Sequence, residues 1–357
     1  MNKRFLVGLV LLAAAAGMIA LWQFLPHPQP VQQITVHGYV GSEKVGLLRN
    51  PRVIKILRQR YGLTVDHTSM GSIEQVRTNT AGKDFLWPSN EIALEIYKES
   101  HPGKVKAETV FNSPIVLYSW EPVTEALIQQ GIVEKAEGTY YVVDMPKLID
   151  LIRSGKEWKD IGLPQLYGKV SVISTDPTKS NSGNMFYGLL ANLLNNGQVA
   201  DDQAVERLLP TIRAYYESLG YLEQGSGDLF KRFVRTGMGD KPLIAGYENQ
   251  LVEFSLENEA NREQILAQIR ILYPRPTVWS SHPLIALTPN GEVLLKAMQD
   301  TDIQRIAWEQ HGFRSGLVGI QNDPKILNVV GIPATVTSVM PLPRPSAMER
   351  LIQGLLQ

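Results

Sequence analysis

The strongest chemical signal in the sequence is a run of small polar residues, Ser180-Asn181-Ser182-Gly183. It stands between a stretch predicted to be a strand and an apolar stretch predicted to be a helix. The N-terminus of a helix presents N–H groups without intrahelical partners and a partial positive charge, so it attracts anions. Serine and asparagine also cap helices in the ordinary way, so this run alone does not decide between binding and capping.

Similar junctions occur earlier in the chain, where three predicted strands end in small polar residues: Gly41-Ser42, Gly71-Ser72 and Pro88-Ser89-Asn90. Open α/β sheets bind ligands at the carboxyl ends of their strands. The segment Ser72-Ile73-Glu74-Gln75 also matches a capping box, which predicts that a helix starts at Ser72. The recurrence of such junctions favours ligand binding over capping alone.

Other polar and basic residues near these junctions give weaker signals. Tyr247 follows the predicted strand Pro242–Gly246, and a tyrosine in this position is more often a packed aromatic than a ligand contact. Lys44, Arg77 and Lys179 lie close to the junctions, and each is expected to be a solvated charge.

No motif in the sequence indicates catalysis. The chain has no cysteine, which excludes disulfides, a thiol nucleophile and cysteine-ligated metals. HExxH, GxSxG, the P-loop pattern and GxGxxG are all missing, and Gly237-Met238-Gly239 lacks the third glycine of a dinucleotide-binding loop. We therefore expect no enzyme activity, no metal site and no cofactor.

The composition is that of a globular protein without a nucleic-acid partner. The 357 residues include 35 Lys+Arg against 35 Asp+Glu, and 44% are apolar. This length suits one large or two ordinary domains. A nucleic-acid binder normally has a basic excess, which this chain lacks.

The N-terminus predicts export. Lys3 and Arg4 precede an uncharged apolar run, Phe5–Leu25, and about 20 such residues span a bilayer. The run is longer than the apolar core of most signal peptides, so an uncleaved transmembrane anchor in residues 1–30 is favoured over a cleaved signal. In both cases the body lies on the periplasmic side of a bacterial inner membrane, because the basic pair stays in the cytoplasm.

The rest of the chain predicts an α/β fold in which strands and helices alternate. Ile34–Val40, Leu63–His67, Asp84–Leu86 and Val170–Ser174 are predicted strands, and the alternation favours a mostly parallel sheet. A second series of strands and helices after residue 112 indicates two lobes.

Near the C-terminus, Ser346 and Glu349 match a second capping box. Met348, Leu351, Ile352, Leu355 and Leu356 follow as an apolar stripe, which predicts an amphipathic helix. Such a helix usually docks on its own domain, and a partner protein is the alternative.

This layout resembles the type II periplasmic solute-binding proteins of ABC importers, particularly the molybdate/sulfate-like extracellular solute-binding family. The resemblance covers about residues 34–314. It rests on matching stretches in order: Gly41-Ser42-Glu43, Met70-Gly71-Ser72, Phe111–Trp120, Asp176–Gly183, Tyr247-Glu248, Tyr273–Ala286 and Gln304–Phe313.

The resemblance implies a two-lobed fold with two hinge strands. Residues 31–111 and 274–357 would form the first lobe, and residues 112–273 the second. It also implies a cleft that captures a small ligand, favouring an oxyanion held by neutral donors, with the ligand residues Ser42, Ser72, Ser182, Gly183 and Tyr247. Glu43 would disfavour an anion unless its carboxylate points away.

The expected partners are the small ligand and an ABC permease or another inner-membrane protein. A membrane-tethered sensor or scaffold, using the same fold to bind a partner protein, remains the alternative function. Proximity of the gene to a permease and an ATPase would favour transport over this alternative.

Overall fold

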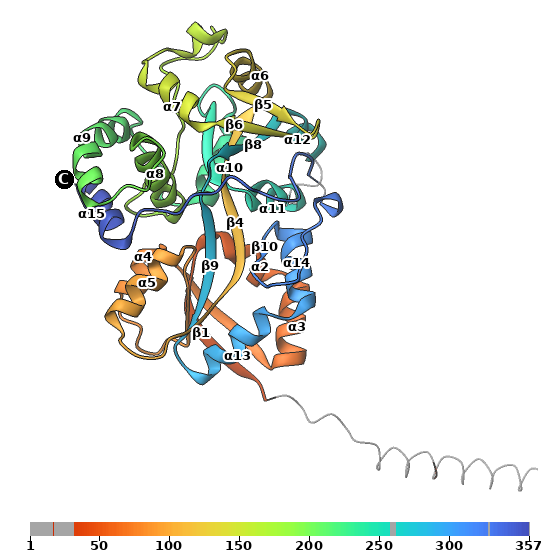
Figure 1. Cartoon of the computed structure of the whole chain (residues 1–357). Helices are drawn as coiled ribbons and strands as arrows, with labels where there is room; N and C mark the ends of the chain where they lie inside the picture. Colours follow the sequence, from red (N-terminus) through yellow and green to blue (C-terminus); the bar gives the residue numbers. More distant parts are fainter. Residues whose placement is uncertain (1–16, 18–31, 258–261, 328, 357) are drawn as a thin grey trace, which may run out of the picture. The chain divides into compact units, whose positions relative to one another are not determined.

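Strand β4 (Lys106–Trp120) is the element around which the fold is built (Figure 1). The computed structural model describes residues 17, 32–257, 262–327 and 329–356. The predicted membrane anchor or signal falls in residues 1–16 and 18–31, outside the described residues. Among the residues that are described, none of the helices is both long and apolar enough to cross a membrane. Residues 34–357 form a compact unit of their own.

The first half of β4 belongs to a sheet that forms the first lobe. Its neighbours are β9 (Trp279–Ala286) and the short β10 (Arg314–Ser315), both antiparallel to β4. Beyond β9 the sheet continues through β3 (Phe85–Trp87), β1 (Ile34–Val40) and β2 (Leu63–Ser69), of which β1 runs parallel to both its neighbours.

The helices of the first lobe cover both faces of this sheet, because the side chains of a strand alternate between the faces. Val36 and Val40 of β1 pack into one apolar core, whereas Tyr39 packs into another. The first core includes α2 (Val45–Arg49), α3 (Pro51–Tyr61), α13 (Pro289–Met298) and α14 (Thr301–His311), and the second includes α4 (Ser72–Arg77) and α5 (Glu91–Ser100).

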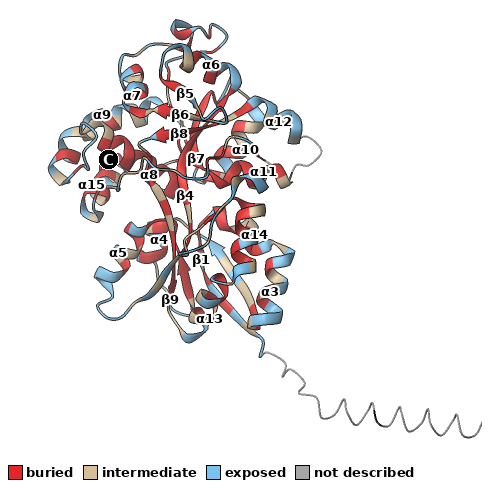
Figure 2. Ribbon diagram, turned by 45° about the vertical axis from the view of Figure 1, so that its right-hand side comes forward, coloured by how far each residue is buried: buried red, intermediate tan, exposed pale blue. Residues whose placement is uncertain are grey.

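The second half of β4 belongs to the sheet of the second lobe. It pairs there with β7 (Leu243–Tyr247) and β8 (Ile269–Arg275), and the sheet continues to β6 (Tyr140–Asp144) and β5 (Val133–Ala136). Around it lie α6 (Glu121–Gln129), α7 (Met145–Arg153), α8 (Asn181–Leu194), α9 (Asp202–Ser218), α10 (Ser226–Thr236), α11 (Asn249–Glu257) and α12 (Arg262–Gln268). Figure 2 shows this sheet buried between its helices.

Three segments of the described chain pass between the lobes: β4, the link from β8 to β9, and the C-terminal segment after β10. The third segment is fixed to the second, because the backbone of Thr277 bonds to Ser338 and Met340 at 2.9 Å each. It ends in α15 (Pro345–Leu356), which packs against α9 and α8 of the second lobe (Figure 1). The C-terminal helix therefore lies on the second lobe, although the expected division placed it in the first.

Three sequence-based expectations need correction. The sheet is mixed, since β4 is antiparallel to β7, β8, β9 and β10. Val170–Ser174 forms only an isolated bridge, from Ile173 to Ile244. The hydroxyl of Tyr215 bonds to both the backbone N–H and the C=O of Val172, which are then not available to a neighbouring strand. Ser72 starts α4 as expected but does not cap it, because its Oγ accepts the N–H of Ser89 instead.

Candidate ligand-binding cleft

A cavity of about 940 Å³ lies between the two lobes. The junctions that line it from the first lobe are Gly41-Ser42, Gly71-Ser72 and Ser89, and those from the second are Ser180-Asn181 and Gly225-Ser226. This volume is near the upper end of the range for sites that enclose small organic ligands.

Helices with open N-termini surround this cavity. The two longer ones are α8 and α10, whose N-cap residues are Ser180 and Gly225, and neither has a side chain bonded to its first-turn amides. The short α4 and the 3₁₀ turn η1 (Ser42–Lys44) begin in the same way, after Gly71 and Gly41. By contrast, side chains cap α3, α5, α7, α9, α13 and α14, whereas α6, which does not line the cavity, is also uncapped. The first-turn N–H groups that face the cavity are thus left for another partner.

Contacts across the cleft bring these N-termini together in pairs. A Cβ placed on Gly71 would lie 2.6 Å from the carbonyl oxygen of Lys179, so α4 meets the loop before α8. A Cβ on Gly225 would lie 3.9 Å from Oγ of Ser42, so α10 meets η1. Asn181 joins the lobes directly, because its Nδ2 donates to the carbonyl oxygen of Ser89 at 3.0 Å.

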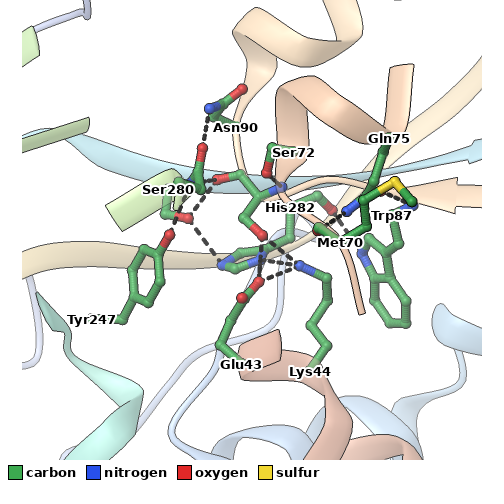
Figure 3. Close-up of polar contacts among 12 residues, drawn as sticks. Glu43, Lys44, Met70, Ser72, Gln75, Trp87, Asn90, Tyr247, Ser280 and His282 are labelled. Carbon is green, nitrogen blue, oxygen red and sulfur yellow. Dashed lines mark hydrogen bonds and ion pairs between the residues drawn. The ribbon is translucent and has the colours of Figure 1, made fainter. Parts of the chain in front are cut away.

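A buried network of charged and polar groups, here called the floor, adjoins the cavity (Figure 3). Glu43 and Ser89 of the network line the cavity, whereas Lys44 and His282 lie behind them. Lys44 is fully buried, and its Nζ donates to Oγ of Ser89 at 2.7 Å, to Nδ1 of His282 at 3.0 Å and to the carboxylate of Glu43. His282 in turn contacts Oγ of Ser280 at 3.2 Å. The expectation that Lys44 is a solvated charge is wrong.

The network fixes the ionisation of its members. Burial alone would raise the pKa of Glu43, but Lys44 and His282 outweigh it and hold this pKa well below its ordinary value. Burial lowers the pKa of Lys44, which the carboxylate of Glu43 opposes. Burial, followed by the charge of Lys44, lowers the pKa of His282 to about 4. At neutral pH the floor therefore holds an ionised Glu43 and a neutral imidazole, with Nζ of Lys44 bonded to both.

Tyr247 connects this floor to the second lobe. Its side chain is buried, its hydroxyl oxygen accepts the Nδ2 hydrogen of Asn181 at 2.8 Å, and it lines the cavity. Burial raises its pKa well above the ordinary value, so the hydroxyl stays protonated. Figure 3 shows the ring turned toward Ser280 and His282.

The cleft includes three of the five residues expected to bind ligand. Ser42, Ser72 and Tyr247 line the cavity, whereas Ser182 and Gly183 do not. Oγ of Ser182 lies 2.8 Å from Oγ1 of Thr175, and the Cα of Gly183 packs against the backbone of the same residue. Ser180 and Asn181, the first two residues of the Ser180–Gly183 run, line the cavity instead.

The sequence patterns did not indicate that α10 and α11 contribute to the cleft. Gly225, Ser226 and Lys231 line the cavity, as does Glu253. A signal for the first two was present, because the three Gly-Ser dipeptides of the sequence, at 41–42, 71–72 and 225–226, all begin helical turns at this cavity. Glu253 gave no comparable signal, since a glutamate within a helix is ordinarily solvated.

No family model and no curated protein matches the sequence. Among solved structures, the chain is similar to the periplasmic binding protein AfuA from Actinobacillus pleuropneumoniae, determined with bound fructose-6-phosphate; identity is 15%, coverage 89% of this chain and 96% of that one, and the TM-score 0.56.

Two further structures match to a similar degree. One is the substrate-binding protein of an ABC transporter from Agrobacterium tumefaciens, with 13% identity, coverage of 91% and 94%, and a TM-score of 0.56. The other is iron-bound HitA from Pseudomonas aeruginosa, with 13% identity, coverage of 90% and 97%, and a TM-score of 0.55. The chain thus has the mixed α/β, two-lobed fold of periplasmic binding proteins.

Proposed function

We propose that this protein is an extracytoplasmic solute-binding protein that captures a small oxyanion-bearing solute between its lobes for ABC-type uptake. The observation that supports it is the convergence of open helix N-termini, above all those of α8 and α10, on one interlobe cavity. Backbone N–H groups at such termini bind anions through charge–dipole hydrogen bonds. In this proposal the protein is related to the molybdate/sulfate-like binding proteins and catalyses no reaction.

Capture in this proposal uses closure of the lobes. Ser42 and Ser72 of the first lobe and Ser180, Asn181 and Tyr247 of the second contribute to the same cavity, so a bound solute contacts both sides. Opening would separate these groups, and the solute therefore stabilises the closed state by its differential contacts. Residues 34–111 and 274–315 form the first lobe, and residues 112–273 together with α15 form the second.

The carboxylate of Glu43 is compatible with an anionic solute because it is already compensated. It lines the cavity, but the ammonium of Lys44 is its direct partner. Lys179, before α8, and Lys231, within α10, add positive charge on the side of the second lobe. Neutral donors and these few cations would hold the anion without an excess of basic residues.

Export and tethering belong to the same proposal. The segment before residue 31 would direct the body to the periplasmic side, either as an anchor or as a cleaved signal, and an ABC permease would receive the solute. Cell fractionation of the native protein distinguishes anchor from signal: an anchor keeps it in the membrane fraction, and a cleaved signal releases it on osmotic shock.

A ligand screen tests the proposed binding. The compact unit, residues 34–357, is titrated in a thermal-shift assay with phosphate, sulfate, molybdate and phosphate monoesters, and in parallel with neutral sugars and polyamines. A ligand at 100 times its Kd stabilises the folded state by about 2.7 kcal/mol. Stabilisation by one or more oxyanion compounds supports the proposal, whereas stabilisation by a neutral sugar or a polyamine alone would refute it.

A further inference from the structure

The four N-termini around the cavity differ in one respect that locates the anion. The first turns of η1, α4 and α10 carry Glu43, Glu74 and Asp228, and these carboxylates line the cavity. The first turn of α8 carries no acidic residue, and Lys179 stands directly before it. A carboxylate near a helix N-terminus partly neutralises the positive charge of that terminus. The N-terminus of α8 has no such carboxylate, so its positive charge remains available to a ligand.

The charges that line the cavity are closely balanced. Four carboxylates line it, from Glu43, Glu74, Asp228 and Glu253, against the three cations Arg49, Lys179 and Lys231. Lys44, directly behind Glu43, brings the total to four of each sign. An inorganic dianion such as sulfate would leave a net negative charge in the closed cleft, which is costly where water is excluded. A ligand that also carries an ammonium leaves a smaller net charge, or none.

Glu253 is, with Glu74 and Asp228, one of three lining carboxylates that form no ion pair with a lysine or arginine of the described residues. It lies in the middle of α11 rather than in the first turn of its own helix, and its side chain is only 18% exposed. Its Oε1 is 3.1 Å from Nδ1 of His311, and within the described residues no lysine or arginine forms an ion pair with it. Because a Cβ on Gly46 would collide with this carboxylate, the glutamate sits directly against the first lobe.

We propose, building on the oxyanion-binding function above, that the solute is a small zwitterion whose oxyanion binds at the N-terminus of α8 and whose ammonium binds Glu253. The chemical class is an aminoalkyl phosphate or phosphonate, sulfonate or carboxylate. The cavity of about 940 Å³ has room for such a molecule, whereas an inorganic oxyanion would fill only a small part of it. The aromatic and apolar side chains of Phe230 and Met70, also in the lining, suit the carbon chain between the two charges.

Three matched pairs of compounds test this inference, because the members of a pair differ only in the ammonium group. They are phosphoethanolamine and ethyl phosphate, taurine and ethanesulfonate, and β-alanine and propionate. Calorimetric titration of residues 34–357 should show at least tenfold tighter binding of the amine in one or more pairs. Because the three pairs carry a phosphate, a sulfonate and a carboxylate, comparing their affinities shows which oxyanion the site binds.

Substitutions at Glu253 test the assigned partner. In Glu253→Gln, the preference for the amine over its matched compound should fall to less than twofold, and Glu253→Asp, which keeps the charge, should restore part of it. Glu99→Gln, an exposed position on α5, is the matched control and should keep the full preference. Circular dichroism confirms that each variant is folded before titration.

The possible failures are distinct. If phosphate or sulfate binds while every amine binds no tighter than its matched compound, the zwitterion inference is wrong and the oxyanion function stands. If Glu253→Gln keeps the amine preference, the assignment of Glu253 is wrong. If no oxyanion of any kind binds, both this inference and the proposed function are overturned.

Discussion

The guanidinium of Arg314 and the carboxylate of Glu248 form a buried, bidentate ion pair that joins the lobes. Nε of Arg314 lies 2.7 Å from Oε2 of Glu248, and Nη2 lies 2.8 Å from Oε1. Arg314 stands in β10 of the first lobe, and Glu248 follows β7 of the second. The same guanidinium donates to the carbonyl oxygens of Pro333 and Ala334, so it also holds the C-terminal segment at the hinge.

Replacing Arg314 should destabilise the protein strongly. Arg314→Met leaves Glu248 buried without its counter-charge, and removing one partner of a buried ion pair costs about 3–5 kcal/mol. Urea unfolding of residues 34–357 measures the change in the free energy of unfolding. The double variant Arg314→Met/Glu248→Gln should recover a large part of the loss, because the uncompensated charge is gone.

An exposed ion pair provides the control for this substitution. Arg275 and Glu134 are both more than half exposed, and a surface pair contributes about 1 kcal/mol or less. Arg275→Met should therefore change the unfolding free energy by no more than this amount. An equally small effect of Arg314→Met would show that the interlobe pair does not hold the hinge.

A carboxylate at position 180 should prevent oxyanion binding while leaving the fold intact. Ser180 is the N-cap of α8 in extended conformation, which is the position where aspartate caps a helix well. In Ser180→Asp the new carboxylate would take the first-turn N–H groups and repel an anion. We expect at least a hundredfold loss of oxyanion affinity with unchanged or higher thermal stability.

The control for this charge effect is Ser180→Ala, which keeps the backbone N–H groups free. It should bind oxyanions within about tenfold of the natural protein, since one neutral hydrogen bond contributes about 0.5–1.5 kcal/mol. Titration calorimetry compares the two variants. Retained affinity in Ser180→Asp would mean that the N-terminus of α8 is not the anion site.

Gly183 should be needed for the fold of the loop before α8 rather than for ligand contact. A Cβ at this position would lie 2.3 Å from the carbonyl oxygen of Thr175 and 2.9 Å from the nitrogen of Pro177, both backbone atoms that cannot move freely. Gly183→Ala should destabilise by about 1–3 kcal/mol, as overpacking does. Gly227→Ala is the control: open space surrounds that position in α10, so it should be neutral or stabilising. Chemical denaturation of both variants decides between these outcomes.

Local patterns in the sequence predicted most single elements correctly. β1 has the predicted boundaries, α4 starts at Ser72 as predicted, and α15 forms the predicted amphipathic helix near the C-terminus. These features depend on alternation, helical spacing and start signals, which act over a few neighbouring residues. The failures depend on distant partners: Tyr215 removes Val172 from a regular strand, and Ser89 diverts the side chain of Ser72 from capping.

The candidate site was predictable only in part, for the same reason. Gly-Ser junctions indicate open helix N-termini, but which of them face one cavity depends on the packing of the two lobes. Lys44 illustrates the limit: nothing in its local sequence distinguishes it from a surface lysine, yet its partners Ser89 and His282 lie 45 and 238 positions away along the chain.

His282 should make stability depend on pH between about 4 and 6.5. Its pKa in the folded protein is about 4 against an ordinary value of 6.5, so in this window the unfolded chain binds a proton that the folded protein does not. Stability therefore falls as the pH drops from 6.5 to 4, by about 3 kcal/mol from this group. Unfolding of the natural protein and of His282→Gln at a series of pH values should show a flatter profile in the variant. Parallel profiles would exclude His282 as the source.

The C-terminal helix should contribute to stability through its apolar stripe, because it is docked on the second lobe. Leu351 of α15 is fully buried, and Gly354 packs against Leu209 of α9. Leu351→Ala should cost about 2–4 kcal/mol in unfolding free energy, as expected for a buried leucine. Leu356, in the same helix, is 66% exposed, and Leu356→Ala should cost less than about 0.5 kcal/mol. Equal, small effects of the two substitutions would mean that α15 leaves this surface in solution and that the stripe is free for a partner protein.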